Sequence, residues 1–171
     1  MRKMDVMQAI KERRSIRRYQ QRPVADEILT TLMEAVRVAP SASNRQEWRF
    51  IVVKDRAQIE KLATITGQLF LATAPVIVAG VALNPERVMR CEVPAYAVDL
   101  SIALTHLMLA AVEHGLGTCW IGWFDQNEVK RTLRIPDEYK VVGLLTLGYP
   151  AESPDFRGRK PLNEVVSYDY F

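Results

Sequence analysis

Residues 94–114, PAYAVDLSIALTHLMLAAVEH, decide the fold because they form the longest helix that the sequence predicts. Pro94 suits the first turn of a helix, and Gly115 suits the left-handed residue that ends one. At about 1.5 Å per residue the helix is roughly 30 Å long. Its side chains are apolar on nearly all sides, which is typical of a buried helix. In a chain of 171 residues, we expect that complete burial of this helix needs a second subunit.

The elements on both sides of this helix predict an α+β fold in a single domain of residues 1–171. Further helices are expected after the capping residues Asp5, Asp55 and Asp125, and over residues 25–38 and 68–73. Strands are expected over residues 49–53, 75–83, 118–121 and 141–147. The predicted architecture is a sandwich in which helices surround a small mixed β-sheet. The C-terminal tail ends in apolar and aromatic residues, and we expect it to dock on a partner subunit.

Positive charge is gathered into two short clusters, although the net charge is only +3. Arg13, Arg14, Arg17 and Arg18 crowd one end of the chain, and residues 157–160 add three more basic side chains. Two small clusters suit a phosphorylated small molecule better than nucleic acid, which is bound by a continuous basic face. We therefore expect no nucleic-acid partner. The competing hypothesis of a nucleic-acid binder depends on these clusters alone and predicts steeply salt-dependent binding.

Several common catalytic and nucleotide sites have no motif in the sequence. No GxGxxG follows the first expected strand and no GxxxxGK(S/T) occurs, so a Rossmann or P-loop site is not supported. Cys91 and Cys119 belong to no CxxC or Cys/His set, and no metal site is expected. Neither Ser41 nor Cys119 has a base at a recognisable spacing. If the protein is an enzyme, a bound cofactor carries its chemistry.

The sequence predicts neither a secretory signal nor a membrane span. Residues 1–5 do not begin an apolar signal segment. The apolar run over residues 74–83 contains Pro75 and Gly80, and it is shorter than the roughly 20 residues that cross a bilayer. The cysteines are expected to stay reduced, as in the cytosol. We therefore expect a cytoplasmic protein without a membrane partner.

Three stretches carry groups that suit a flat, phosphorylated ligand. Guanidinium groups in residues 13–17 flank the hydroxyl of Ser15, and arginine forks bind phosphate through paired hydrogen bonds. The loop over residues 40–44 offers small polar side chains and backbone amides around a turn. Residues 115–122 contain three glycines, which let the backbone approach a ligand closely. Each stretch also has a structural explanation: a solvated helix end, a capping turn and tight packing.

In this order and at these spacings, the stretches resemble the nitroreductase superfamily of FMN oxidoreductases. The resemblance extends from about Met4 to the C-terminus. It is carried by the following segments: RRSIRRY (residues 13–19), APSASNRQEW (39–48), GLGTCWIG (115–122), LGYP (147–150) and RGRKPL (157–162). The resemblance implies an FMN-dependent oxidoreductase that uses NADH or NADPH, forms a homodimer with FMN at the subunit interface, and exchanges the C-terminal tail between subunits.

The resemblance also implies which residues hold the phosphate end of FMN. Arg13 and Ser15 would hold the phosphate and the ribityl chain, with Arg14 alongside. Arg157 and Arg159 would return from the C-terminal segment to the same phosphate. The two basic clusters, separated by most of the chain, would then form one site.

A second group would contact the flavin ring. The ring would be packed by residues of the other subunit, namely Pro40, Ser41, Ala42 and Asn44. Gln68 matches a polar position that contacts the flavin in some branches. Ile121 and Gly122 would present backbone amides near flavin N5. Glu47 departs from the family pattern, where many relatives have proline, so the rigidity of this loop is open.

Arg17 would reach the pyrimidine edge of the flavin. A hydride that enters at N5 leaves negative charge around N1 and O2, and a fixed cation stabilises that charge in a sheltered site. One pocket would serve the dinucleotide and then the acceptor, in a ping-pong reaction. The expected acceptors are nitroaromatic compounds, quinones or similar small molecules. No side chain of the protein is predicted to be catalytic.

Two alternatives keep the flavin and change the activity. The chain could belong to a specialised branch of the family, such as a flavin destructase, a reductive dehalogenase or an enoyl reductase. The short stretch over residues 84–93 leaves no room for a large lid and favours a general reductase. The chain could also be a flavin-binding or redox-sensing module with little turnover.

Overall fold

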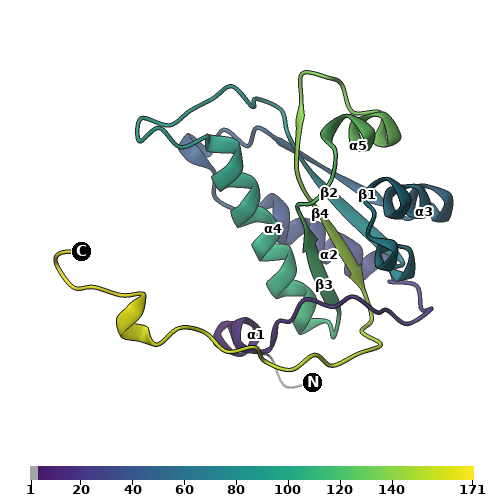
Figure 1. The fold of residues 1–171 in the computed structure, drawn as a ribbon, viewed down its shortest axis with the longest axis horizontal. Helices are drawn as coiled ribbons and strands as arrows, with labels where there is room; N and C mark the ends of the chain where they lie inside the picture. The colour runs from purple at the N-terminus through teal and green to yellow at the C-terminus, as the bar shows by residue number, and fades with distance from the viewer. Residues whose placement is uncertain (1–3) are drawn as a thin grey trace.

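The computed structural model describes residues 4–171 and shows one sheet between two layers of helices (Figure 1). The helices are α1 (Val6–Glu12), α2 (Asp26–Arg37), α3 (Arg56–Ile65), α4 (Ala95–Glu113) and α5 (Gln126–Leu133), with 3₁₀ helices η1 (Ala42–Asn44), η2 (Leu69–Thr73) and η3 (Leu162–Glu164). The strands are β1 (Trp48–Val53), β2 (Val76–Ala82), β3 (Gly117–Ile121) and β4 (Lys140–Gly148). Part of the N-terminal stretch in which we expect no secretory signal, residues 1–3, lies outside the described residues.

Local sequence signals place the helix starts correctly. The carboxylates of Asp5, Asp55 and Asp125 each accept a hydrogen bond from the backbone N–H three residues further on. Each side chain thus satisfies an amide that the first turn of its helix leaves free. Gly115 follows α4 with a φ of 69°, in the left-handed region that favours glycine. The predicted caps and the predicted end of the long helix are confirmed.

The α+β class is confirmed, but the four strands pair antiparallel and do not form a mixed sheet. Their order is β1-β2-β4-β3, and each neighbouring pair is antiparallel. Strands β2 and β3 do run in the same direction, as expected of strands joined by a long helix. They are not neighbours, because β4 inserts between them and pairs with both. Parallel pairing within residues 4–171 is limited to one isolated bridge, between Ser15 and Thr118.

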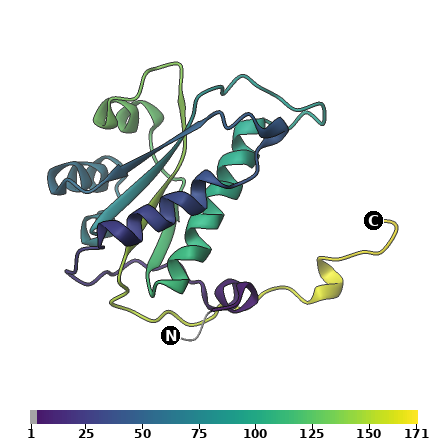
Figure 2. The same ribbon diagram turned by 180° about the vertical axis from the view of Figure 1, so that it is seen from behind.

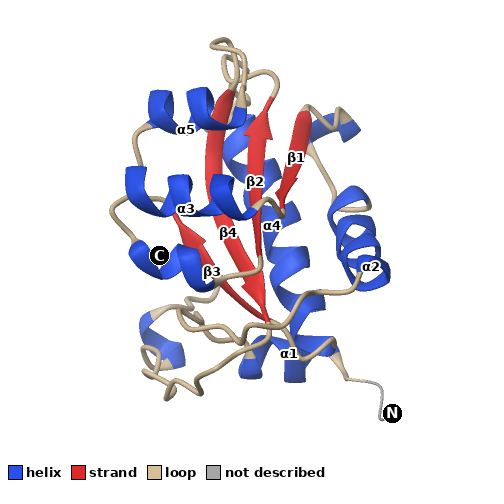
Figure 3. Ribbon diagram, turned by 90° about the vertical axis from the view of Figure 1, so that its right-hand side faces the viewer, coloured by secondary structure: helices blue, strands red, loops and turns tan. Residues whose placement is uncertain are grey.

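Both faces of the sheet are covered by helices (Figure 3). Helices α2 and α4 pack on one face, which β2 lines with Val76 and Val78. Helices α3 and α5 pack on the other face, which β2 lines with Ile77 and Ala79. This alternation follows from the two-residue period of a strand. It explains why residues 76–82 are apolar at almost every position, since a strand covered on both sides has no solvent-facing row.

Helix α4 is buried along one side and only partly covered along the other. Leu104 and Leu107 are fully buried against the sheet and α2, and Leu100 is fully buried beside Gly80 of β2. Leu109 and Ala110 line an apolar groove with residues of α1 and α2. By length and composition alone α4 could cross a membrane, a property that buried core helices share. The chain therefore covers only part of the helix, in keeping with the expectation that its burial needs a second subunit.

The C-terminal tail leaves the body of the molecule and carries exposed apolar side chains. Residues after β4 pass α1 and end in an isolated segment that contains only η3 (Figure 2). The exposed side chains of this segment include Leu162, Val165, Tyr168, Tyr170 and Phe171. Exposed apolar groups gathered in one segment are typical of a surface that another protein covers. The expected tail exchange stays a prediction, for which this geometry leaves room.

We predict that Leu104→Ala lowers the free energy of unfolding by about 2–5 kcal/mol, since it removes a fully buried side chain between α4 and the sheet. Thr105→Ala, at the adjacent exposed position, is the matched control and should change it by less than about 0.5 kcal/mol. Urea denaturation followed by circular dichroism measures both values. Equal effects of the two substitutions would contradict the assignment of this face to the core.

Candidate functional site

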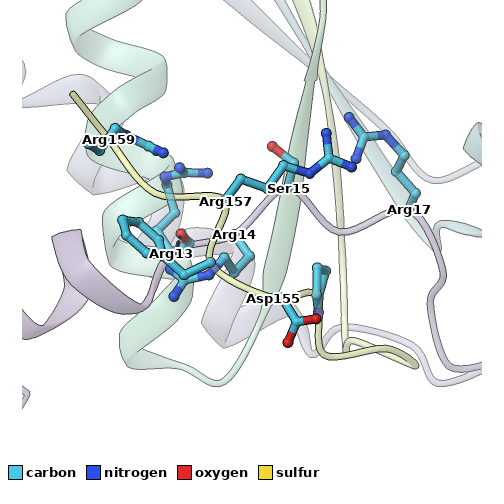
Figure 4. A pocket seen from close by; sticks show the side chains of 9 residues that line it. Arg13, Arg14, Ser15, Arg17, Asp155, Arg157 and Arg159 are labelled. Atoms are coloured by element: carbon cyan, nitrogen blue, oxygen red, sulfur yellow. Dashed lines mark hydrogen bonds between the residues drawn. The ribbon is translucent and has the colours of Figure 1, made fainter.

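The two basic clusters of the sequence meet in one open pocket of about 150 Å³. The segment after α1 contributes Arg13, Arg14, Ser15 and Arg17, and the segment after β4 contributes residues 154–157 and Arg159. Figure 4 shows Arg13 and Arg159 together on one side of the pocket, while Arg157 extends toward Ser15 and Arg17 on the other. All six residues that we predicted at the phosphate end and the pyrimidine edge therefore line one pocket.

The pocket carries far more positive than negative charge. Among residues 4–171, five guanidinium groups line it, and the one carboxylate in its wall is Asp155. Within the described part of the chain, none of the five forms a salt bridge. The Cζ atoms of Arg14 and Arg159 lie 5.0 and 5.3 Å from the ring centroid of Phe156. Like charges held this close repel one another, so the arrangement favours a bound anion with several oxygen acceptors.

Hydrogen bonds to the sheet hold the first arginine segment although it is neither helix nor strand. The Ile16 N–H donates to the Thr118 carbonyl at 2.9 Å. The buried hydroxyl of Tyr19 donates to the Ile16 carbonyl at 2.7 Å and lies 2.7 Å from Thr146 Oγ1. Burial raises the pKa of Tyr19, so the hydroxyl stays neutral and able to donate. A Cβ at Gly117 would collide with the Ile16 side chain, so this close approach requires glycine.

Glu152 orients the same segment from the other end of the chain. Its Oε1 accepts hydrogen bonds from the backbone N–H of Arg17 at 2.6 Å and of Arg18 at 3.2 Å. Its Oε2 pairs with Arg18 Nε at 3.1 Å. The N–H of Arg17 first, and then the bonds from Arg18, hold the pKa of Glu152 below its ordinary value. Glu152 could not be predicted from the sequence, because residues 135 positions apart share no local pattern.

A second surface, at the end of β3, carries three of the residues predicted at the flavin ring: Gln68, Ile121 and Gly122. The Gln68 side chain donates to the carbonyl of Trp123, the residue after Gly122, at 3.4 Å. Two residues beyond Gln68, the ring centroid of Phe70 lies 5.9 Å from Arg17 Cζ. Gln68 therefore lies beside the residue that follows Gly122, and Arg17 lies near Phe70 of the neighbouring 3₁₀ helix η2. Ile121 is buried, so it can offer a ligand only its backbone groups.

The loop over residues 40–44 lies far from this pocket within one chain. Its Ala42 N–H donates at 2.9 Å to Asp99, near the start of α4. The arginine pocket adjoins a hollow lined by Val112, near the end of α4. Val112 lies thirteen positions after Asp99 in the sequence, which corresponds to about 20 Å along a helix. One chain does not bring the loop to the arginines, and its supply by a second subunit stays a prediction.

Glu47, the departure from the expected pattern, is held by two side chains. Asn84 Nδ2 donates to its Oε1 and Arg87 pairs with its Oε2, both at 3.1 Å. The bond from Asn84 first, and then the charge of Arg87, keep the pKa of Glu47 below its ordinary value. The carboxylate is therefore ionised at neutral pH and anchors the end of the loop.

The family model for nitroreductases matches residues 10–149. A protein of Methanothermobacter thermautotrophicus named NADH dehydrogenase/NAD(P)H nitroreductase is 35% identical over 166 residues, covering 91% of this chain and 82% of the relative. The FMN reductase (NAD(P)H) of Bacillus subtilis is 32% identical over 179 residues, covering 94% and 72%. The structure of NADPH:FMN oxidoreductase from Vibrio harveyi, solved with NAD⁺, superimposes with a TM-score of 0.88 at 26% identity, covering 97% and 77%.

We predict that Glu152→Gln destabilises the protein at neutral pH and has little effect in acid. Because the folded-state pKa of Glu152 is lowered, its stabilisation is complete above its ordinary pKa of 4.5 and is lost as the pH falls through the lowered value. Chemical denaturation of the wild type and the variant at pH 7, and in steps below 4.5, measures the difference. A difference that does not shrink toward low pH would contradict a role for the charge.

Proposed function

The chain belongs to the nitroreductase family of FMN-dependent NAD(P)H oxidoreductases, and we propose that it reduces nitroaromatic compounds, quinones or similar small acceptors. When bound, FMN would take a hydride from NADH or NADPH and then reduce the acceptor that replaces the dinucleotide in the same pocket. We propose that residues 1–171 act as one FMN-binding domain in the cytoplasm. The observation that carries the proposal is the pocket of five arginines with a single carboxylate.

The donor set of this pocket fits the phosphate end of FMN. A phosphate monoester carries close to two negative charges at neutral pH and three acceptor oxygens. Arg13, Arg157 and Arg159 would supply charge and paired hydrogen bonds, and Ser15 would supply a short hydroxyl bond. Arg14 would lie alongside, and its guanidinium donates to the carbonyls of Lys11 and Arg13.

Arg17 would serve the ring end of the flavin. It lies in the same pocket and also near the ring of Phe70, on the side that carries Gln68 and Gly122. Glu152 holds the backbone of Arg17, so its guanidinium is presented from a fixed position. A cation held in place at the pyrimidine edge favours the charge that this edge acquires on reduction. Backbone N–H groups of Ile121 and Gly122 would face N5.

We propose a homodimer in which each flavin is enclosed by both chains. The loop with Pro40, Ser41, Ala42 and Asn44 would cross to the partner, since about 20 Å separate it from the arginines of its own chain. The apolar groove beside Leu109 and the exposed apolar tail would be covered in the same assembly. Flavin binding and dimer formation would then depend on each other.

The acceptor class is supported by Trp123. This residue follows Gly122, and 81% of its surface is exposed, an unusual position for so large an apolar side chain. Its carbonyl is held by Gln68, which we place at the flavin ring. An exposed indole at the rim of the ring site offers a stacking face to a flat aromatic acceptor, which fits nitroaromatic compounds and quinones.

We predict that Arg13→Ala combined with Arg159→Ala lowers the affinity for FMN by about 100-fold or more, because each change removes a charge-assisted contact to the phosphate. Titration of the apoprotein with FMN, followed by flavin fluorescence, measures the dissociation constant. Arg37→Ala, a surface arginine that pairs with Glu34, is the control and should leave the affinity unchanged. A double variant purified with undiminished flavin would overturn the phosphate assignment.

We predict that Trp123→Ala lowers kcat/KM for a nitroaromatic compound or a quinone by about two- to tenfold, the range of one aromatic contact. Trp123→Phe should retain most of the activity. Ferricyanide, an acceptor without an aromatic ring, should be reduced at the wild-type rate by both variants. Equal losses for aromatic and non-aromatic acceptors would contradict a stacking role.

Bleaching of the flavin by NADH or NADPH in stopped flow separates an enzyme from a binding module, which would bleach slowly.

A further inference from the structure

The loop between α2 and β1 has a strained backbone. Three of its residues have positive φ angles without being glycine: Ser43 at 56°, Asn44 at 52° and Gln46 at 54°. Asn tolerates this left-handed region, but it is unfavourable for Ser and Gln. Three such residues within four positions would relax to other conformations unless their surroundings hold them.

Bonds within the loop close it but do not fix its place on the protein. The Asn44 N–H donates to the Ser41 carbonyl at 2.8 Å, and the Gln46 N–H donates to Ser41 Oγ at 3.0 Å. The Gln46 side chain donates to the Asn44 carbonyl at 3.0 Å. Because all these partners belong to the loop itself, it could pivot as a unit. Its position must come from contacts outside residues 41–46.

Arg87 supplies such contacts to both ends of the loop. Its two terminal nitrogens, Nη1 and Nη2, each lie 3.3 Å from the Ala42 carbonyl, and Nη1 lies 3.1 Å from Glu47 Oε2. The side chains of Arg87 and Glu47 are only 21% and 27% exposed, so water screens this pair less than a surface pair. The rigid fork of arginine spans two acceptors that a lysine, with its single charged nitrogen, would not bridge in the same way.

Arg87 is itself fixed to the core of the protein. Its carbonyl accepts a hydrogen bond at 3.0 Å from the N–H of Ala95, the first residue of α4. Asp99, one turn further along α4, holds the Ala42 N–H at 2.9 Å. The Glu47 carbonyl accepts from the Leu83 N–H at 3.0 Å, just after β2. The loop is therefore connected through Arg87 and Asp99 to the start of the buried helix.

We infer that Arg87 and Glu47 are positioning residues, which hold the strained loop over residues 41–46 in the shape that completes the FMN site of the partner subunit. This inference rests on the proposed function, in which the loop packs on the partner's flavin. The segment after β2 then has a definite role, because it carries Arg87, which holds the loop in place. The ion pair between Arg87 and Glu47 holds this end of the loop, as a conformationally rigid residue at position 47 could do through its own covalent structure.

The test compares Arg87→Ala, Arg87→Lys and Glu47→Gln in the full-length chain. Arg56→Ala, which removes an exposed pair with Glu60, is the matched control. Hydrogen exchange of the apoprotein reports on the loop without FMN: the amides of Ala42, Asn44 and Gln46 should exchange faster in Arg87→Ala than in wild type or the control. Circular dichroism should show an unchanged fold. Should Arg87→Ala fail to fold, Arg87→Lys and Glu47→Gln carry the same comparison.

The affinity for FMN tests the positioning role itself. We expect the FMN dissociation constant of Arg87→Ala to rise about tenfold, as for one lost charge-assisted contact. The FMN dissociation constants of Arg87→Lys and Glu47→Gln should rise less, because each variant keeps part of the interaction between positions 87 and 47. The KM for the aromatic acceptor should rise more than kcat falls, since the loop packs on the ring and contributes no reacting group.

The outcomes separate this inference from the proposed function. Unchanged loop exchange in Arg87→Ala would overturn the brace. Faster exchange with unchanged FMN affinity would show that the loop is braced for another purpose, and would overturn the positioning role. A wild-type protein that binds no FMN would overturn the proposed function, and the exchange data would still decide whether Arg87 and Glu47 hold the loop.

Discussion

Helix α4 packs lengthwise on the sheet, and this packing sets the distance between the two parts of the proposed flavin site. Leu100, Leu104 and Leu107 are fully buried, so the helix cannot tilt or slide without opening cavities in the core. Asp99 near its start holds the loop over residues 41–46, and the arginine pocket adjoins its end. The two parts stay about 20 Å apart in one chain. A flavin that touches both must lie between two chains.

At the far end of α4, the arginines are held by partners distant in sequence. Residues 13–18 make one isolated bridge to β3. Their hydrogen bonds to Glu152 and Thr118, and the bond that Tyr19 donates to the Ile16 carbonyl, nevertheless leave the backbone little freedom. Such preorganisation matters for an anion site, because guanidinium groups that are free to spread apart would lower their repulsion and lose the converging geometry. The free energy of folding offsets the repulsion between these charges before any ligand binds.

At the start of α4, the structure shows how a glutamate at position 47, where many relatives have proline, affects the loop. Glu47 does not make the loop flexible, since its carboxylate interacts with Asn84 and Arg87 in a half-buried network. Both ends of the helix therefore have the same feature: a carboxylate, Glu152 or Glu47, that fixes an irregular segment of the proposed flavin site. Irregular backbone can approach a flat cofactor where a regular strand or helix cannot, and it needs such outside support.

The sequence by itself determined the helix caps, the long buried helix, the residues of the arginine pocket and the family, because these depend on periodicity and on motifs a few residues long. Asp5, Asp55 and Asp125 cap the helices as predicted, and the two basic clusters meet as the resemblance implied. The tertiary structure alone decided that β4 inserts between β2 and β3, that Glu152 orients Arg17, and that Arg87 braces Glu47. These features join residues 40 to 135 positions apart, and such contacts depend on how whole elements pack, which no local pattern encodes.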